Sequence, residues 1–68
     1  GSSRKDVLNK LYIALKECAE TLYWLELLYS CDYISRTEYD SLHSDCEELR
    51  KLLSSITKSV RDGTIPNS

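Results

Sequence analysis

The side chains that could do chemistry in this sequence are three cysteines, one histidine and several carboxylates. His43 and Cys46 are three residues apart, a spacing that places an imidazole and a thiol on one helical face, as in a zinc site. Structural zinc usually takes four such ligands, and the sequence offers no second pair. We therefore interpret Cys46 as a core cysteine beside a histidine at the rim, and we expect no metal or other cofactor.

Catalysis would need more groups than these residues provide. A catalytic thiol requires exposure, a neighbouring base and a group that orients the base, whereas Cys18 and Cys46 fall on apolar positions of the repeats described below. Glu17 and Glu20 lie one turn apart without a predicted pocket, which favours solvation or contact with a partner helix over acid–base work. The two glycines stand too far apart for a phosphate-binding loop. The sequence therefore predicts that the protein is not an enzyme.

Two long apolar repeats are the elements that must position these side chains. Both repeats alternate spacings of three and four residues, which is typical of one continuous face of a helix. The first repeat consists of Leu8, Leu11, Leu15, Cys18, Leu22, Leu25 and Tyr29. The second repeat consists of Tyr39, Leu42, Cys46, Leu49, Leu53, Ile56 and Val60.

Residues suited to helix ends flank the two repeats. Ser3 is a predicted N-cap with Asp6 in the first turn, Ser35 and Glu38 form a predicted capping box, and Gly63 suits the position after a helix. The predicted organisation is a single domain of residues 1–68, with helices at about 4–31 and 36–61, a turn at about 32–35 and a flexible tail at 62–68.

The predicted fold is an all-α antiparallel helical hairpin, because so short a connection forces the two helices to run in opposite directions. The two repeats should then meet in layers, each burying one residue from either helix. The expected layers are Tyr29 with Tyr39, Leu25 with Leu42, Leu22 with Cys46, Cys18 with Leu49, Leu15 with Leu53, Leu11 with Ile56 and Leu8 with Val60.

The first helix also carries apolar residues on the side away from its repeat, while the corresponding side of the second helix is polar. A hairpin partner covers one stripe of a helix, so a second stripe must meet something else. We expect half of a four-helix bundle, completed by self-association into a dimer of hairpins or a higher oligomer, or by a partner protein. The predicted oligomer interface consists of Ile13, Tyr23, Trp24, Leu27 and Cys31.

The charged residues divide between the two ends of the predicted hairpin, although the net charge is only −2. The open end, residues 1–16 and 51–68, has seven cations and two carboxylates; the turn end, residues 17–50, has two cations and nine carboxylates. Copies aligned in one assembly would merge their open ends into a basic surface for RNA or DNA phosphates. The candidate nucleic-acid-binding residues are Arg4, Lys5, Lys10, Lys16, Lys51, Lys58 and Arg61.

Cysteine usage and hydropathy predict a cytoplasmic protein. The odd number of cysteines without CxxC spacing is typical of free thiols in a reducing compartment. No apolar run approaches the roughly 18 residues of a membrane span, and no signal peptide is recognised. We expect no membrane contact.

Several segments together resemble one family. "SSRKDVLNKLYIALKECAETLYWLELL", then "YIS" and "EYDSLHSDCEELRKLLSSITKSV", resemble the bacterial four-helix-bundle proteins encoded by intervening sequences within 23S ribosomal RNA genes. Members carry two further helices before the S-R-K-D segment, so the resemblance is to their C-terminal half. They are also similar to accessory proteins of diversity-generating retroelements, which look like homopentamers that bind nucleic acid and a reverse transcriptase. The resemblance implies a bundle-forming protein, with nucleic-acid binding as the alternative function.

Overall fold

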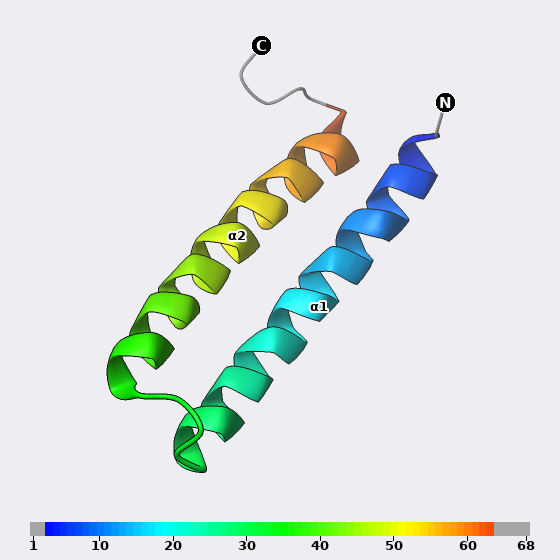
Figure 1. Ribbon diagram of the computed structural model, residues 1–68. Helices are drawn as coiled ribbons and strands as arrows, with labels where there is room; N and C mark the ends of the chain where they lie inside the picture. The colour runs from blue at the N-terminus through cyan, green and yellow to red at the C-terminus, as the bar shows by residue number, and fades with distance from the viewer. Residues whose placement is uncertain (1–2, 64–68) are drawn as a thin grey trace.

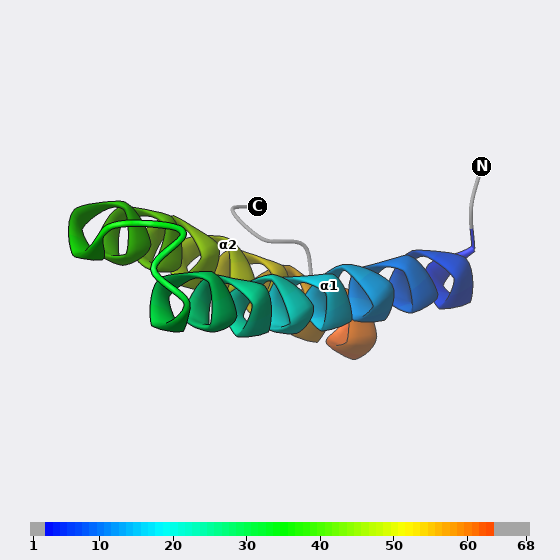
Figure 2. The ribbon, with the colours of Figure 1, turned by 60° about the horizontal axis from the view of Figure 1, so that its bottom comes forward.

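Two antiparallel helices of equal length form the protein, which we describe from a computed structural model over residues 3–63. Helix α1 spans Arg4–Ser30 and helix α2 spans Arg36–Asp62, each with 27 residues. The start of α1 and the end of α2 lie at the same end of a rod of 44 × 21 × 17 Å (Figure 1). Viewed from below, the two helices cross at a shallow angle rather than running strictly parallel (Figure 2). The predicted all-α helical hairpin is confirmed.

Side-chain caps begin both helices at the predicted residues. The Ser3 hydroxyl accepts a hydrogen bond of 3.2 Å from the Asp6 backbone N–H. At the start of α2, the Glu38 N–H donates to the Ser35 hydroxyl at 3.0 Å, and the Ser35 N–H donates to the Glu38 carboxylate at 2.8 Å. This capping box lowers the pKa of Glu38, chiefly through the backbone N–H of Ser35.

The ends of the helices differ slightly from the expected positions. Helix α1 ends at Ser30, since Cys31 already has non-helical torsions of φ −94° and ψ 10°. Helix α2 continues through Asp62 and is capped by Gly63, whose φ of 77° suits a residue without a Cβ. Of the expected tail, Asp62 is therefore helical, and residues 64–68 lie outside the described residues.

The link between the helices begins with a Schellman motif. Asp32 adopts a positive φ of 62°, a conformation that aspartate tolerates better than most residues. The Asp32 N–H donates to the Tyr29 carbonyl at 3.1 Å, and the Tyr33 N–H donates to the Leu28 carbonyl at 2.8 Å. These two bonds satisfy the last carbonyls of α1 and turn the chain back toward α2.

Stacked rings join the two helices next to the turn. The Tyr29 and Tyr39 ring centroids lie 4.9 Å apart with an interplanar angle of 25°, which confirms this predicted layer. The His43 ring lies 5.4 Å from the Tyr39 ring at an interplanar angle of 40°, and the Arg36 guanidinium lies over the Tyr29 ring at 5.8 Å. The aromatic layer fixes the register of α2 on α1 at this end.

Three buried residues mark the contact line between the helices: Cys18 and Leu25 of α1 and Thr57 of α2. Thr57 is small, and its hydroxyl donates to the Leu53 carbonyl at 2.7 Å, so its burial leaves no polar group unsatisfied. Small residues at a helix contact let the two backbones approach closely. Thr57 was not part of the predicted repeat.

The second repeat was predicted to be buried at every position, and this prediction is wrong. Leu42 and Leu49 are 46% and 49% exposed, although they were expected to be covered by α1. Helix residues are spaced by about 100°, so a contact line through Cys46 and Thr57 leaves these leucines to one side of it. Leu15 and Leu53, which were expected to be buried, are half-buried.

We expect Thr57→Leu to destabilise the hairpin by about 1–3 kcal/mol, because a larger side chain must push the helices apart. Thr57→Val keeps the volume and removes only a hydroxyl that already bonds within its own helix, so it should cost less than about 1 kcal/mol. Urea unfolding followed by circular dichroism, at one fixed protein concentration, measures both variants. Equal stability of the two variants would mean that the helices are not in close contact at Thr57.

Candidate interaction surface

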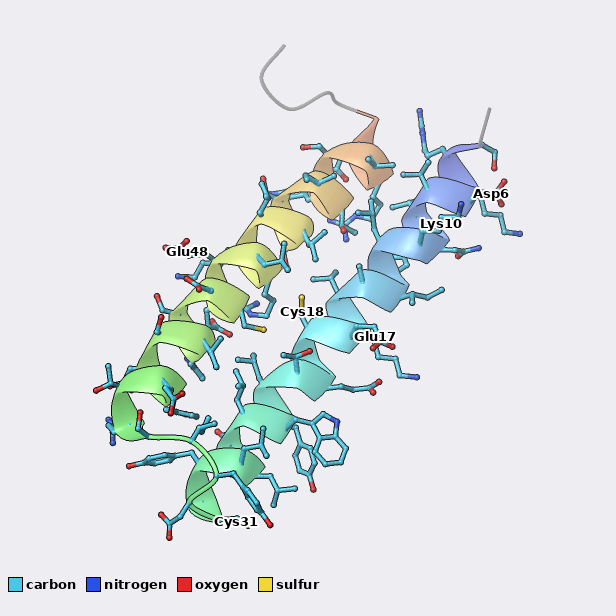
Figure 3. The ribbon with its side chains drawn as sticks, in the orientation of Figure 1. Asp6, Lys10, Glu17, Cys18, Cys31 and Glu48 are labelled. Carbon is cyan, nitrogen blue, oxygen red and sulfur yellow. The ribbon has the colours of Figure 1, made fainter. Side chains whose placement is uncertain are left out.

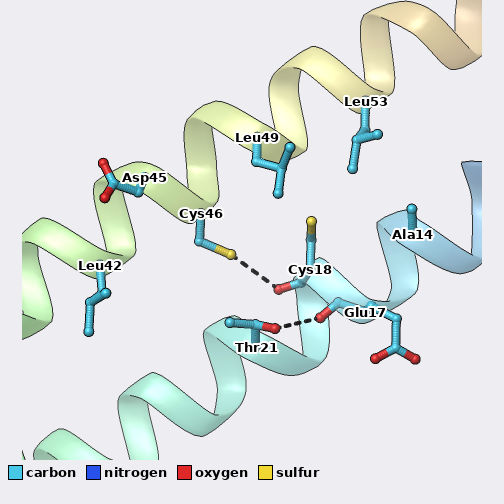
Figure 4. Close-up of a pocket in the computed structure, with 9 residues that line it drawn as sticks. All are labelled: Ala14, Glu17, Cys18, Thr21, Leu42, Asp45, Cys46, Leu49 and Leu53. Carbon is cyan, nitrogen blue, oxygen red and sulfur yellow. Dashed lines mark hydrogen bonds between the residues drawn. The ribbon is translucent and has the colours of Figure 1, made fainter.

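An open groove of about 600 Å³ runs between the helices on one side of the contact line (Figure 4). Helix α1 contributes one wall with Ala14, Glu17, Cys18 and Thr21. Helix α2 contributes the other wall with Leu42, Asp45, Cys46, Leu49 and Leu53. The displaced leucines of the second repeat thus form a wall of this groove.

Two of the polar side chains that line the groove are hydrogen-bonded to carbonyl groups of α1. The Cys46 thiol donates to the Cys18 carbonyl at 3.5 Å, and the Thr21 hydroxyl donates to the Glu17 carbonyl at 2.9 Å (Figure 4). Burial raises the pKa of the Cys46 thiol, and the neighbouring Cys18 adds to the effect. The groove therefore offers a mainly apolar surface, with the acidic residues Glu17 and Asp45 in its two walls.

The groove does not bring together a catalytic or metal-binding set. His43, which the sequence offered as a zinc ligand beside Cys46, packs at a tilted angle against Tyr39 instead. Over residues 3–63, no three histidine, cysteine, aspartate or glutamate side chains come close enough to hold a metal ion. What the groove can do is accept apolar side chains.

The predicted interface residues are all exposed, but they do not share one face. Ile13 and Trp24 are 59% and 55% exposed, and Tyr23 packs edge-on against Trp24 at 5.5 Å. Helix residues are spaced by about 100°, so Ile13 and Trp24 lie on the side of α1 that is next to the groove. Tyr23 lies on the side of α1 away from the groove. Cys31 is at the turn, just beyond the helix (Figure 3).

The exposed leucines of α2 and the groove side of α1 together form one apolar surface, which we call the groove face. It extends over both helices, and the predicted interface missed its α2 half. A sequence signal was present: Leu52 lies beside the second repeat and widens its apolar stripe toward this side. The groove face consists of Ala14, Thr21, Trp24 and Leu28 of α1 and Leu42, Leu49 and Leu52 of α2.

The candidate nucleic-acid-binding residues are exposed but only partly grouped. By helical spacing, Lys5 and Lys16 of α1 and Lys51 and Lys58 of α2 lie on the side opposite the groove. Lys10 lies on the groove side of α1 (Figure 3). We call the set of four lysines opposite the groove the lysine face.

The two arginines at the open end are engaged at the end of α2. The Arg4 guanidinium lies beside Gly63, so that a Cβ there would be 3.4 Å from it. Arg61 forms an ion pair of 3.5 Å with Asp62. A cation near the last carbonyls of a helix is favourable, which gives Arg4 a structural role at this end.

Both arginines of the turn end are paired with carboxylates of their own helix. Arg36 bonds Asp40 at 3.0 Å, and Arg50 makes two bonds to Glu47, at 3.1 and 3.0 Å. The hydrogen bond from Arg50 is the main reason that the pKa of Glu47 is lowered. Seven other carboxylates of this end have no such arginine partner, so its surface stays strongly acidic.

These features describe a charged two-helix rod with an exposed apolar face, in which no group of three potential metal ligands forms among residues 3–63. Residues 1–55 match the family described as 23S rRNA-intervening sequence protein, and the chain belongs to this family. Comparisons with curated proteins and with solved structures gave no match. Within residues 3–63, neither helix is long and apolar enough to cross a membrane.

We expect Cys31 to react first with iodoacetamide near neutral pH, because it is exposed, whereas burial holds the half-buried Cys46 in its protonated form. Peptide mass spectrometry of briefly treated, folded protein measures the order, and protein unfolded in urea serves as the control in which all three thiols should react alike. Modification of Cys46 as fast as Cys31 would contradict the shielded thiol.

Proposed function

We propose that this protein is a non-enzymatic assembly module of the 23S rRNA-intervening sequence type, and that it self-associates through the apolar residues of α1. The observation that carries the proposal is the exposure of Ile13, Trp24 and Leu27 on a helix whose other stripe already packs on α2. An exposed patch of large apolar side chains on a small protein is typical of an interaction site.

The small core of the hairpin supports the same function. In the described residues only Cys18 and Leu25 are buried apolar side chains. Domains of this size rarely reach useful stability from such a core alone, and oligomerisation is a common remedy. Covering a large apolar side chain contributes about 1.5–3 kcal/mol, so a few residues of α1 can decide whether the protein is well folded.

Trp24→Ala combined with Leu27→Ser should raise the dissociation constant of the assembly at least about 100-fold, which corresponds to roughly 2.7 kcal/mol of lost apolar burial. Sedimentation velocity across a concentration series measures it. Tyr33→Ser is the matched control, because Tyr33 is a large exposed aromatic in the turn, away from the proposed interface. A well-folded monomer formed by the unmodified protein would refute the assembly function.

A second candidate function is weak, sequence-independent binding of RNA or DNA. The specific observation in its favour is the lysine face, where Lys5, Lys16, Lys51 and Lys58 are exposed on one side of the open end. The exposed Tyr12 lies on the same side and could stack on a base. Lysines on a surface contact phosphates without reading base sequence.

Lys16→Glu with Lys58→Glu should abolish binding to a mixed-sequence duplex, and Lys58→Glu alone should reduce the slope of log affinity against log salt by about one. Fluorescence anisotropy across a salt series measures both. Ser41→Asp with Ser44→Asp is the charge-matched control for the single variant, since it also lowers the net charge by two units, at the turn end. Absence of binding at about 50 mM salt by an intact oligomer would leave the assembly function alone.

A further inference from the structure

Two of the three cysteines meet across the contact between the helices. Cys18 of α1 is buried, whereas Cys46 of α2 is half-buried, and both line the groove. The Cys46 sulfur lies 3.5 Å from the Cys18 carbonyl oxygen, and its side chain points from α2 toward Cys18 (Figure 4). The two thiols also interact with each other, since a hydrogen bond between them is one of the causes that raise the pKa of Cys46.

We propose that Cys18 and Cys46 are a redox-sensitive pair, and that oxidation joins them in a disulfide that locks α1 to α2. The bond forms within one chain, so this inference goes beyond the proposed function and does not depend on self-association. In the reducing compartment that the cysteine usage predicts, both thiols stay free. The disulfide forms when the surroundings become more oxidising.

The packing of the two helices suits such a bond. A disulfide joins residues whose Cα atoms are about 4.4–6.8 Å apart. Packed helices have axes about 8–10 Å apart, and each Cα lies about 2.3 Å from its axis, so Cα atoms that face each other fall near this range where the residues at the contact are small. Cys18, Cys46 and Thr57 are small residues on the contact line of this hairpin.

Cys31 is not an alternative partner within the folded chain. It caps the C-terminal end of α1 and is exposed at the turn. At about 1.5 Å per residue, the second half of α1 holds it about 20 Å from Cys18. The fold therefore selects the pair of Cys18 and Cys46 from the three pairs that three cysteines could form.

The bond forms by exchange with a small disulfide, such as that of glutathione. The Cys46 thiol, which the groove leaves accessible, loses its proton and attacks one sulfur of the small disulfide, so that a mixed disulfide forms and one small thiolate leaves. The Cys18 thiol then loses its proton and attacks the Cys46 sulfur, and the second small thiolate leaves. Two cysteine thiols are oxidised, one small disulfide is reduced, and the two released thiolates take up the two protons.

The groups around the pair make this exchange slow. Burial is the main cause that raises the pKa of Cys46, and Cys18 and Glu47 raise it further, whereas the Arg50 guanidinium acts in the opposite direction. Two hydrogen bonds to Glu47 hold that guanidinium in place. Cys46 is therefore a weak nucleophile, and the pair responds to a lasting change in the balance of thiols and disulfides rather than to a brief one.

The disulfide stabilises the hairpin by restricting the unfolded chain. Closing the loop between Cys18 and Cys46 lowers the unfolding equilibrium constant by about 100-fold or more, provided that the bond does not strain the folded helices. Linkage makes this effect reciprocal, so folding favours formation of the disulfide by the same factor. The folded protein should thus form the bond under less oxidising conditions than the unfolded chain.

Equilibration of the Cys31→Ser variant in buffers of reduced glutathione and glutathione disulfide measures this preference. After an acid quench, mass spectrometry of the intact chain detects the loss of two hydrogen atoms, and peptide mapping identifies the linked cysteines. The equilibrium constant for exchange should be at least about tenfold greater for the folded protein than for the same variant in urea. Circular dichroism reports whether the variant keeps its helices.

The Cys46→Ala variant is the matched control, because it keeps Cys18 and Cys31, which the fold holds apart. It should form an intramolecular disulfide in urea and none when folded. In a second measurement, the oxidised Cys31→Ser variant should unfold at a higher urea concentration than its reduced form. A folded protein that forms the Cys18–Cys46 bond no more readily than the unfolded chain, or an oxidised form that unfolds at the same or a lower urea concentration, overturns the proposal and leaves the assembly function untouched.

Discussion

The close approach of α1 and α2 along the line through Cys18, Leu25 and Thr57 is the contact on which the rest of the structure depends. A hairpin has one interhelical contact, so the residues that form it also decide which residues remain uncovered. Here the α2 side of the line passes through Cys46 and Thr57, which are small, rather than through the leucines. With these small residues at the contact, Leu42 and Leu49 lie at its edge, where they form part of the wall of the groove.

The caps and the turn give this contact its length and its direction. The capping box at Ser35 and Glu38 and the Schellman motif at Asp32 confine the link to five residues, so the helices run antiparallel over their whole length. Equal helix lengths bring the first residues of α1 beside the last residues of α2. The separation of charge into a basic and an acidic end therefore follows from local turn chemistry, since it exists only when these segments are side by side.

The elements of this fold were predictable, but the rotation of α2 about its own axis was not. Spacings of three and four residues identify a stripe, and S-x-x-E identifies a helix start, because both are local signals. An apolar stripe is more than 100° wide, however, so it is compatible with contact through either its leucines or its small edge residues. Which of these residues form the contact depends on how closely the backbones of α1 and α2 can pack, and this is a property of the two helices together. Asp32 is a similar case, because aspartate tolerates a positive φ without requiring it.

The same limit explains why the candidate surface was found only in part. The sequence identified Ile13, Trp24 and Leu27 because they stand out on a helix whose repeat is already assigned. It missed the α2 half of the groove face, because Leu42 and Leu49 belonged to the repeat that was expected to be buried. The sequence thus predicted that the hairpin has an exposed apolar surface. Which residues form that surface depended on how the two helices pack against each other.

The groove face and the lysine face lie on opposite sides of the hairpin, so the proposed self-association and the proposed nucleic-acid binding would use different residues. The two proposed functions would be coupled through the orientation of the copies. Antiparallel copies would leave the lysines exposed but would place an acidic turn end beside each group, which would lower the local positive potential at distances within about one Debye length. Parallel copies would merge two basic ends and attract phosphates more strongly, at the expense of like-charge repulsion within the assembly. Because the same charges would act in both proposed processes, an orientation that favours a stable dimer would limit any affinity for nucleic acid.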